Sequence, residues 1–431
     1  MAHVQRLIQY NKDVMKVLWI TNILFPEARL LLTGAGDLKS SGGWMLGAAE
    51  ALQKYCSVDL HVATVSAIVK KLEVFQGKNI TYYILPYGRG NLIYNSEYEP
   101  FWKDIKKIVQ PDIIHIYGTE FTHGLSYVKA CGNKNVVISL QGLKSEIAKY
   151  YCAGISKSEI LQNQTFRDLL KGNILLEQKK FFKSGKYEIE FLKSVRNVIG
   201  RTSWDKVHVR AINPHVCYYR CNEILRNEFY DGAMWNYDSC AKHSIFLSQA
   251  GYPIKGLHKV LLAMPLILHK YPDAVLRIAG VDITAFRTLS EKIRLCGYGN
   301  YIRHLIQKLE LKNHISFIGS LNAMQMKEEY LKANIFICPS SIENSPNSLG
   351  EAQILGTPCI ASFVGGVPDM MIGNEDNLYR FEDVEILAEK VCKIFASENH
   401  QVNMIQSASY RHNPKINSEQ LLHIYQSIFE S

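Results

Sequence analysis

Short β-branched apolar runs alternate with longer amphipathic stretches along most of this chain, and that alternation is what most constrains its fold. Strands alternating with helices build parallel sheets that are covered by helices on both faces. The strand-like runs fall in two series, at 16–20, 58–65, 80–85, 112–117, 136–140 and 197–200, and then at 244–248, 275–280, 315–318, 335–338 and 358–362. Two such series predict an α/β protein with two doubly wound, parallel-sheet domains.

A polar, irregular stretch at 231–243 separates the two series, and we predict that it is the linker. The N-terminal domain is then expected over 1–230 and the C-terminal domain over 244–405. A last amphipathic helix within 406–431 has no strand after it. Residues 1–14 precede the first strand and are either an extension or the result of a misplaced start. A length of 431 residues is typical of two domains.

The composition is that of a globular protein, with 47% hydrophobic and 21% charged residues, which excludes disorder and fibrous repeats. Forty-nine Lys and Arg against forty Asp and Glu give a net charge of +9. A nucleic-acid-binding protein usually concentrates such an excess in a dense basic stripe, and no nucleic-acid partner is predicted. The excess suits an anionic small ligand or an anionic membrane surface.

No apolar run reaches the roughly 18 residues that span a bilayer, and the start lacks a signal-peptide pattern. Ten cysteines are scattered without paired spacing, which predicts reduced thiols and a cytoplasmic protein. Cys217 and Cys221 have no second pair to complete a zinc site, so no metal is predicted. Lysines are interspersed with Phe and Leu over 171–201, which suggests peripheral contact with an anionic membrane, with a solvated helix face as the alternative.

Ligands of open parallel sheets bind at the carboxyl ends of the strands, so the site is expected in a cleft between the two domains. Gly42 and Gly43 lie in the long loop after the first strand, directly before a helix. Glycines there let the backbone approach a phosphate, although a flexible surface loop is the alternative. No G-x-G-x-x-G motif follows a strand directly, so a dinucleotide site is not expected.

Two further loops carry polar side chains at strand ends. Glu120 and His123 follow the fourth strand, where a histidine can position a hydroxyl or stabilise charge, or be an ordinary surface residue. Lys255 and Gly256 follow the strand at 244–248, just before a helix. A lysine there is well placed to neutralise a diphosphate, with a solvated side chain as the alternative.

The segment ENSPNSLGEAQILGTPCIASFVGGVPDM is the most specific of the chain. Glu343 and Glu351 are eight residues apart, and Pro346 suits the first turn of a helix between them. The backbone amides of Asn347 and Ser348 are therefore candidates to hold an anion. Carboxylates on either side of these amides could bracket a sugar and a ribose that are joined by one diphosphate.

Together these motifs resemble the retaining nucleotide-sugar glycosyltransferases of family 4, the group 1 set with the GT-B fold. The resemblance implies that Gly42 and Gly43 lie beneath the donor diphosphate and that His123 contacts the transferred sugar. It further implies that Lys255 and the Asn347 and Ser348 amides neutralise the leaving diphosphate, while Glu343 holds sugar hydroxyls and Glu351 the ribose.

The resemblance also implies an activity without cofactor or metal. The donor would be a nucleotide-diphosphate-sugar and the acceptor a glycan or lipid-linked glycan, as in bacterial surface polysaccharide synthesis. The C-terminal helix would return to the N-terminal domain. Gln249 departs from the family pattern, because many members carry an arginine there; Arg201 is the candidate replacement. A catalytically silent sugar-nucleotide-binding or glycan-binding subunit and a sugar-nucleotide epimerase are the alternatives.

Overall fold

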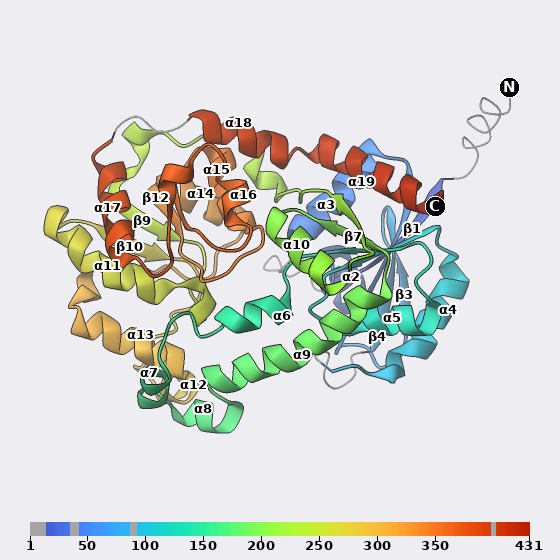
Figure 1. Cartoon of the computed structure of the whole chain (residues 1–431), viewed down its shortest axis with the longest axis horizontal. Coiled ribbons are helices and arrows are strands. Elements are labelled where there is room, and N and C mark those ends of the chain that lie inside the picture. The colour runs from blue at the N-terminus through green and yellow to red at the C-terminus, as the bar shows by residue number, and fades with distance from the viewer. Residues whose placement is uncertain (1–13, 35–42, 87–92, 398–401) are drawn as a thin grey trace.

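The computed structural model describes residues 14–34, 43–86, 93–397 and 402–431, and it contains two α/β domains (Figure 1). Gly42 and residues 1–13 of the predicted extension lie outside the described residues. Each domain is built on its own sheet, which confirms the predicted doubly wound architecture.

The N-terminal sheet has the strand order β3-β4-β2-β1-β5-β6-β7-β8. Its strands are β1 (Met15–Ile20), β2 (Val58–Ser66), β3 (Glu73–Gln76), β4 (Ile80–Pro86), β5 (Ile113–Tyr117), β6 (Val136–Ser139), β7 (Asn197–Gly200) and β8 (Cys217–Arg220). All neighbours pair in parallel except β3, which is antiparallel to β4 at the edge. The sequence patterns did not predict β3 or β8, because neither is an unbroken buried apolar run.

The C-terminal sheet is parallel throughout, in the order β11-β10-β9-β12-β13-β14. Its strands are β9 (Ala241–Leu247), β10 (Val275–Ile278), β11 (Ile315–Phe317), β12 (Ala333–Cys338), β13 (Cys359–Ser362) and β14 (Leu378–Tyr379). Strand β9 begins at Ala241, inside the stretch predicted as linker. All six residues of β12 are buried, as expected of a strand that helices cover on both faces.

The first half of the chain forms a series of helices, most of which cover the two faces of the N-terminal sheet. They are α2 (Pro26–Thr33), α3 (Gly43–Tyr55), α4 (Glu99–Val109), α5 (His123–Cys131), α6 (Lys144–Ile147), α7 (Lys157–Gln162), α8 (Phe166–Lys171), α9 (Ile174–Ser194) and α10 (Ser203–Ile212). Successive residues of β1 serve opposite faces, because Leu18 packs in a core with α4, α5 and α9 residues, whereas Trp19 packs in a core with α3 and α19 residues.

The helices of the second half of the chain surround the C-terminal sheet, except for the last one. They are α11 (Leu257–Lys270), α12 (Leu289–Arg294), α13 (Gly297–Lys308), α14 (Ala323–Lys332), α15 (Asn347–Leu355), α16 (Val367–Met370), α17 (Val384–Phe395), α18 (Val402–Arg411) and α19 (Pro414–Phe429). Helix α19 leaves this domain and packs on α3 and β5 of the other (Figure 1). There the Tyr425 hydroxyl accepts a hydrogen bond from the indole of Trp19 at 3.0 Å and lies 2.6 Å from Nδ1 of His115.

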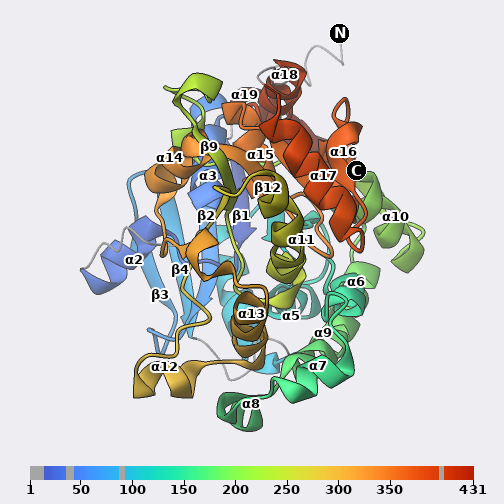
Figure 2. The same ribbon diagram turned by 90° about the vertical axis from the view of Figure 1, so that its left-hand side faces the viewer.

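A segment of the N-terminal half of the chain crosses over in turn and packs on the C-terminal domain. Residues 148–171, here called the arm, lie between β6 and α9 and include α7 and α8. Ile155 and Ile160 of the arm belong to the hydrophobic core of the C-terminal domain. Figure 2 shows α7 and α8 beside α12 and α13. The part of the arm from Ile155 onward therefore packs on the C-terminal domain, although the predicted boundary assigns it to the N-terminal one.

Polar contacts also join the domains directly. The Thr202 hydroxyl donates to Asn344 Oδ1 at 2.6 Å. The backbone amide and hydroxyl of Ser203 both donate to the Asp369 carboxylate at 2.7 Å. Within the described ranges, no helix has the length and apolar character needed to cross a membrane. All ten cysteines lie in those ranges and none forms a disulfide.

Candidate functional site

The carboxyl ends of the N-terminal strands face the start of α15 across the domain interface. Arg201, directly after β7, forms an ion pair with Glu223 at 2.7 Å. The side chain of Asn347, at the start of α15, lies near Glu223 in the segment after β8 and acts against the burial that raises the pKa of this carboxyl group. Arg201 of the N-terminal domain and Asn347 of the C-terminal domain, both predicted as site residues, are therefore close to each other at the domain interface.

Lys255 and Glu343 meet in this region. Gly256 has a φ of +70°, and a side chain there would put Cβ 1.7 Å from the Pro339 carbonyl oxygen, so only glycine fits after Lys255. The Lys255 ammonium lies 2.5 Å from Glu343 Oε1, and the Ser340 hydroxyl donates to the same oxygen at 2.8 Å. Burial alone would lower the Lys255 pKa, but the Glu343 carboxylate outweighs it and holds that pKa well above its ordinary value.

The glycines of the GGVP sequence, Gly365 and Gly366, pack against the backbone of the Glu343 loop. Gly365 has a φ of +52°, and a Cβ there would lie 1.9 Å from the Glu343 carbonyl oxygen. The amide of Gly366 donates to that carbonyl at 3.0 Å. The second part of the motif therefore positions the first, because any larger residue at 365 would displace the Glu343 loop.

Glu351 is buried, with 4% of its surface exposed, and it is paired with a residue that the sequence patterns did not predict. Arg226 donates from Nε and Nη2 to the two carboxylate oxygens at 2.7 and 2.8 Å. Burial raises the pKa of Glu351, and the Arg226 guanidinium acts against that shift. A ribose that binds Glu351 must therefore share this carboxylate with Arg226.

The start of α15 presents free donors. Pro346 precedes the first helical residue and provides no side-chain cap. In the described part of the chain, the amides of Asn347 and Ser348 have no hydrogen-bond acceptor. The amide nitrogens and the helix dipole together make such a terminus suited to an anion.

On the opposite side, His123 is the first residue of α5 and is 2% exposed, which excludes the alternative of an ordinary surface residue. Burial lowers its pKa to about 4, so the ring is neutral near pH 7. Burial also raises the pKa of Glu120 to about 7. Both side chains lie just after β5, as the pattern predicted.

Several buried side-chain atoms in this region have no hydrogen-bond partner among the described residues. They follow β1, β5 and β6 or begin α15: Asn22 Oδ1, Glu120 Oε2, His123 Nδ1, Gln141 Nε2 and Asn347 Oδ1. Buried polar groups are nearly always paired in folded proteins, so each unpaired one needs an explanation. A polar ligand bound between the strand ends and α15 would provide the missing partners.

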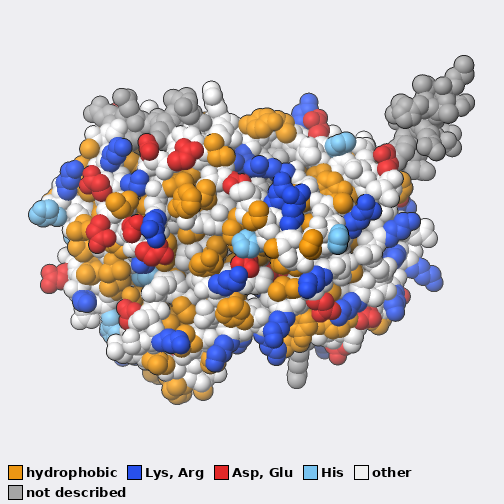
Figure 3. All heavy atoms as spheres, in the orientation of Figure 1, with side chains coloured by type: hydrophobic (Ala, Val, Ile, Leu, Met, Phe, Trp, Pro, Cys, Tyr) orange, Lys and Arg blue, Asp and Glu red, His pale blue; other side chains and the backbone are white. Residues whose placement is uncertain are grey.

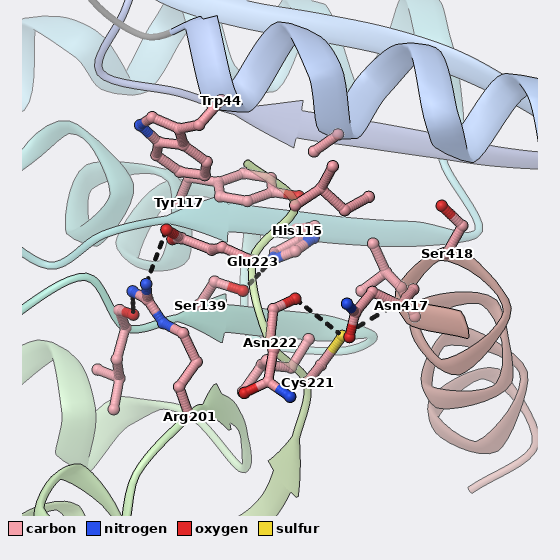
Figure 4. A pocket seen from close by; sticks show the side chains of 15 residues that line it. Trp44, His115, Tyr117, Ser139, Arg201, Cys221, Asn222, Glu223, Asn417 and Ser418 are labelled. Atoms are coloured by element: carbon pink, nitrogen blue, oxygen red, sulfur yellow. Dashed lines mark hydrogen bonds and ion pairs between the residues drawn. The ribbon is translucent and has the colours of Figure 1, made fainter. Parts of the chain in front are cut away.

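Arg201 is placed at the interface but is already engaged. It is 5% exposed, paired with Glu223, and it donates to the Leu140 carbonyl (Figure 4). A diphosphate would have to compete with Glu223 for this guanidinium. Gln249 is exposed just beyond β9 and provides no charge. Gly43 begins α3, as the sequence predicted for a helix near this glycine.

The cavity shown in Figure 4 lies beside this interface, between the strand ends and α19. Its lining includes Trp44, His115, Arg201, Glu223 and Asn417, and its volume is about 40 Å³. That volume suits one or two water molecules, whereas a nucleotide-sugar needs several hundred Å³. The cavity therefore borders the candidate site but is too small to hold a nucleotide-sugar donor.

The sequence patterns missed Glu223 and Arg226 for one reason. Both lie in CNEILRNEF, after a strand that was not recognised, so no strand end drew attention to them. The signal in the sequence that could have identified Glu223 and Arg226 is that each charged residue lies next to apolar residues in this segment. In the residues that the structure describes, no three His, Cys, Asp or Glu side chains gather as a set of metal ligands.

Two parallel α/β domains, with phosphate-suited groups on α15 opposite the N-terminal strand ends, define a GT-B protein. Residues 241–411 match the model of the family "Glycosyl transferases group 1". The matched residues span the C-terminal sheet and its helices.

Curated relatives match part of the chain only. A putative glycosyltransferase, YtcC, of Bacillus subtilis is 37% identical over 116 residues, which cover 26% of this chain and 26% of YtcC. Spore coat protein SA of the same organism is 25% identical over 148 residues, covering 33% of this chain and 37% of that protein. The chain thus aligns with well under half of the length of these relatives.

Solved structures match over nearly the whole chain. Sucrose-phosphate synthase from Thermosynechococcus elongatus has a TM-score of 0.69 at 17% identity, covering 96% of this chain and 99% of that one. A glycosyltransferase from Rickettsia africae has a TM-score of 0.60 at 15% identity, covering 97% and 100%. At such identities the likeness establishes the fold.

Proposed function

We propose that this protein is a retaining, metal-independent glycosyltransferase that uses a nucleotide-diphosphate-sugar as donor. The observation that carries the proposal is the pairing of Lys255 with Glu343 on the domain whose α15 presents two free amides. The family match of residues 241–411 and the GT-B fold support the same activity.

The arrangement suits departure of a nucleoside diphosphate. As the bond between the anomeric carbon and phosphate breaks, negative charge grows on the diphosphate. Lys255 and the amides of Asn347 and Ser348 are donors that stabilise such charge where it develops. Glu343, held by Ser340, is placed to accept hydrogen bonds from sugar hydroxyls once Lys255 turns to the diphosphate.

The N-terminal strand ends complete the site. A neutral His123 accepts or donates one hydrogen bond at Nδ1, as contact with a sugar hydroxyl requires. Attack from the face that the diphosphate leaves gives retention, with the diphosphate taking the acceptor proton. We propose a glycan or lipid-linked acceptor, as in bacterial surface polysaccharide synthesis, in a cytoplasmic enzyme.

The first test is a thermal-shift screen of the whole chain with UDP-, GDP-, ADP- and CMP-linked sugars, with and without a chelator. A donor present at about 100 times its dissociation constant adds roughly 2.7 kcal/mol of stability. We expect one base to raise the melting temperature and the chelator to leave the shift unchanged. A shift that the chelator abolishes contradicts metal independence, and the anomeric configuration of the product, read by NMR, tests retention.

A catalytically silent subunit remains the second candidate, because Gln249 is uncharged and Arg201 is engaged by Glu223. Release of free nucleotide from the stabilising donor separates the two functions. A transferase releases nucleotide and accelerates on addition of an acceptor. Binding without release, at every acceptor tried, indicates the silent subunit and contradicts the proposed catalysis.

A further inference from the structure

Helix α8 turns its polar side inward and its apolar side to solvent. Asp168 is 4% exposed and the Thr165 hydroxyl donates to the Leu295 carbonyl at 2.8 Å, so the helix is fixed to the C-terminal domain through polar groups. Phe166, Leu169 and Leu170 are 64, 71 and 69% exposed. A surface helix of a globular protein normally has the opposite arrangement, with its apolar residues toward the core.

Lysines surround these leucines. A hollow at the junction of α8 and α9 is lined by Leu169, Leu170, Lys171, Gly172, Leu176, Lys179, Lys180 and Lys183, without any acidic residue. Of the four lysines, Lys180 alone has a carboxylate partner in the described part of the chain, Glu177 at 2.6 Å. Figure 3 shows hydrophobic and basic side chains gathered along the lower end of the molecule, where Figure 1 places α8 and α9.

We propose that this surface, the α8–α9 patch formed by the residues of that hollow together with Phe166, docks on an anionic lipid bilayer. Leucine and phenylalanine enter the boundary between headgroups and acyl chains, while lysines keep their charge among the lipid phosphates. Contacts between proteins are instead depleted in lysine and enriched in tyrosine, tryptophan and arginine. The charge of the patch is complementary to the negative surface of such a bilayer.

The rigid placement of α8 supports this role. A capping box between Thr165 and Asp168 fixes its first turn, and the arm that carries it is anchored by Ile155 and Ile160 in a hydrophobic core. The apolar side chains are therefore held outward by the fold. The inference does not depend on the proposed transferase activity, because neither donor nor acceptor takes part in docking.

The test is co-sedimentation of the whole chain with vesicles of phosphatidylglycerol and phosphatidylcholine in equal parts, without nucleotide. We expect binding that weakens with salt and is lost on vesicles of phosphatidylcholine alone. Lys179→Gln with Lys183→Gln should weaken binding by about fivefold per lysine. Leu169→Ser with Leu170→Ser should weaken it by at least about tenfold.

The matched control is on α4, which also presents exposed lysines beside an exposed apolar residue. Lys103→Gln with Lys107→Gln, and Ile108→Ser, should leave binding unchanged. All substituted residues are exposed, and an unchanged melting temperature verifies the fold of each variant. The lysine pair keeps the proposal testable if the serine variant fails to fold.

Four results would overturn the proposal. Three concern vesicles: absence of binding to anionic vesicles, equal binding to uncharged vesicles, and binding that the leucine and lysine substitutions leave intact. The fourth is a dimer in light scattering that the serine variant converts to a monomer, because the α8–α9 patch would then be a contact between copies of this chain.

Discussion

At the scale of single residues, Lys255 has to exchange partners during the proposed reaction. It is paired with Glu343 in the free protein, and the diphosphate charge that it would meet grows as the donor bond breaks. Lys255→Ala should therefore lower turnover by about 100-fold while weakening donor binding by less than about tenfold. Nucleotide-release kinetics and calorimetry measure the two effects, with the exposed Lys270→Ala as control. Lost affinity with unchanged turnover would assign Lys255 to ground-state binding.

The buried Glu351 forms an ion pair with the partly buried Arg226, so removing one partner leaves the other charge unpaired. Glu351→Gln should lower the free energy of unfolding by about 3 kcal/mol and weaken donor binding. Adding Arg226→Met should restore stability, because no unpaired charge remains, but not donor binding. Urea unfolding and calorimetry of both variants check this. Donor affinity equal to that of the wild type in the Gln variant would contradict a ribose contact at Glu351.

Glu120 gives the native state a distinct dependence on pH. Its pKa is about 7 in the folded protein against 4.5 for an ordinary glutamate. Between these values the folded protein holds a proton that the unfolded chain has released, so stability falls as pH rises through this window. Glu120→Gln removes that loss and should gain up to about 3 kcal/mol relative to the wild type between about pH 4.5 and pH 7.

Urea unfolding of both proteins across the window measures this difference, and groups that the two proteins share cancel in it. A constant difference between the variant and the wild type would show that the Glu120 carboxyl titrates normally.

Residues whose neighbours form motifs can be singled out from the sequence, whereas contacts between segments far apart in the chain cannot. Lys255 and Glu343 were both predicted, although their direct pairing was not. Arg226 is 125 residues from Glu351, and the sequence around either residue does not indicate that contact. The Arg201 side chain was placed correctly beyond a strand end, whereas its engagement by Glu223 depends on tertiary packing.

At the scale of elements, the arm contributes to a core far from its neighbours in sequence. Ile160 is 4% exposed within the core of the C-terminal domain. Ile160→Ala should lower the free energy of unfolding by about 2–4 kcal/mol. Leu161→Ala, one residue away but 56% exposed, is the matched control and should change it little. Equal effects in urea unfolding would contradict the packing of the arm.

The strands differ in how far their sequences reveal them. Buried parallel strands such as β12 are unbroken apolar runs, and the pattern predicts them. Strand β3 alternates between half-buried and exposed residues at the sheet edge, and β14 has only two residues. These elements depend on pairing with a neighbour more than on their own composition.

At the scale of the whole molecule, the two domains exchange elements. The arm from the N-terminal half packs in the C-terminal core, and α19 packs against the N-terminal sheet. Unfolding either domain removes part of the other's core, so we expect a single calorimetric transition with equal calorimetric and van't Hoff enthalpies. Tyr425→Phe should lower the melting temperature of that one transition. Two resolved transitions would show that the domains unfold independently.

The position of α19 has a consequence for synthesis of the chain. The last strand of the N-terminal sheet ends at Arg220, yet the face around Trp19, which α3 covers in part, is fully covered only when residues up to Phe429 have been made. At the usual rates of translation, those intervening residues take roughly 10–40 s. During that interval a nascent sheet displays a partly uncovered apolar face, which is the kind of surface that chaperones bind.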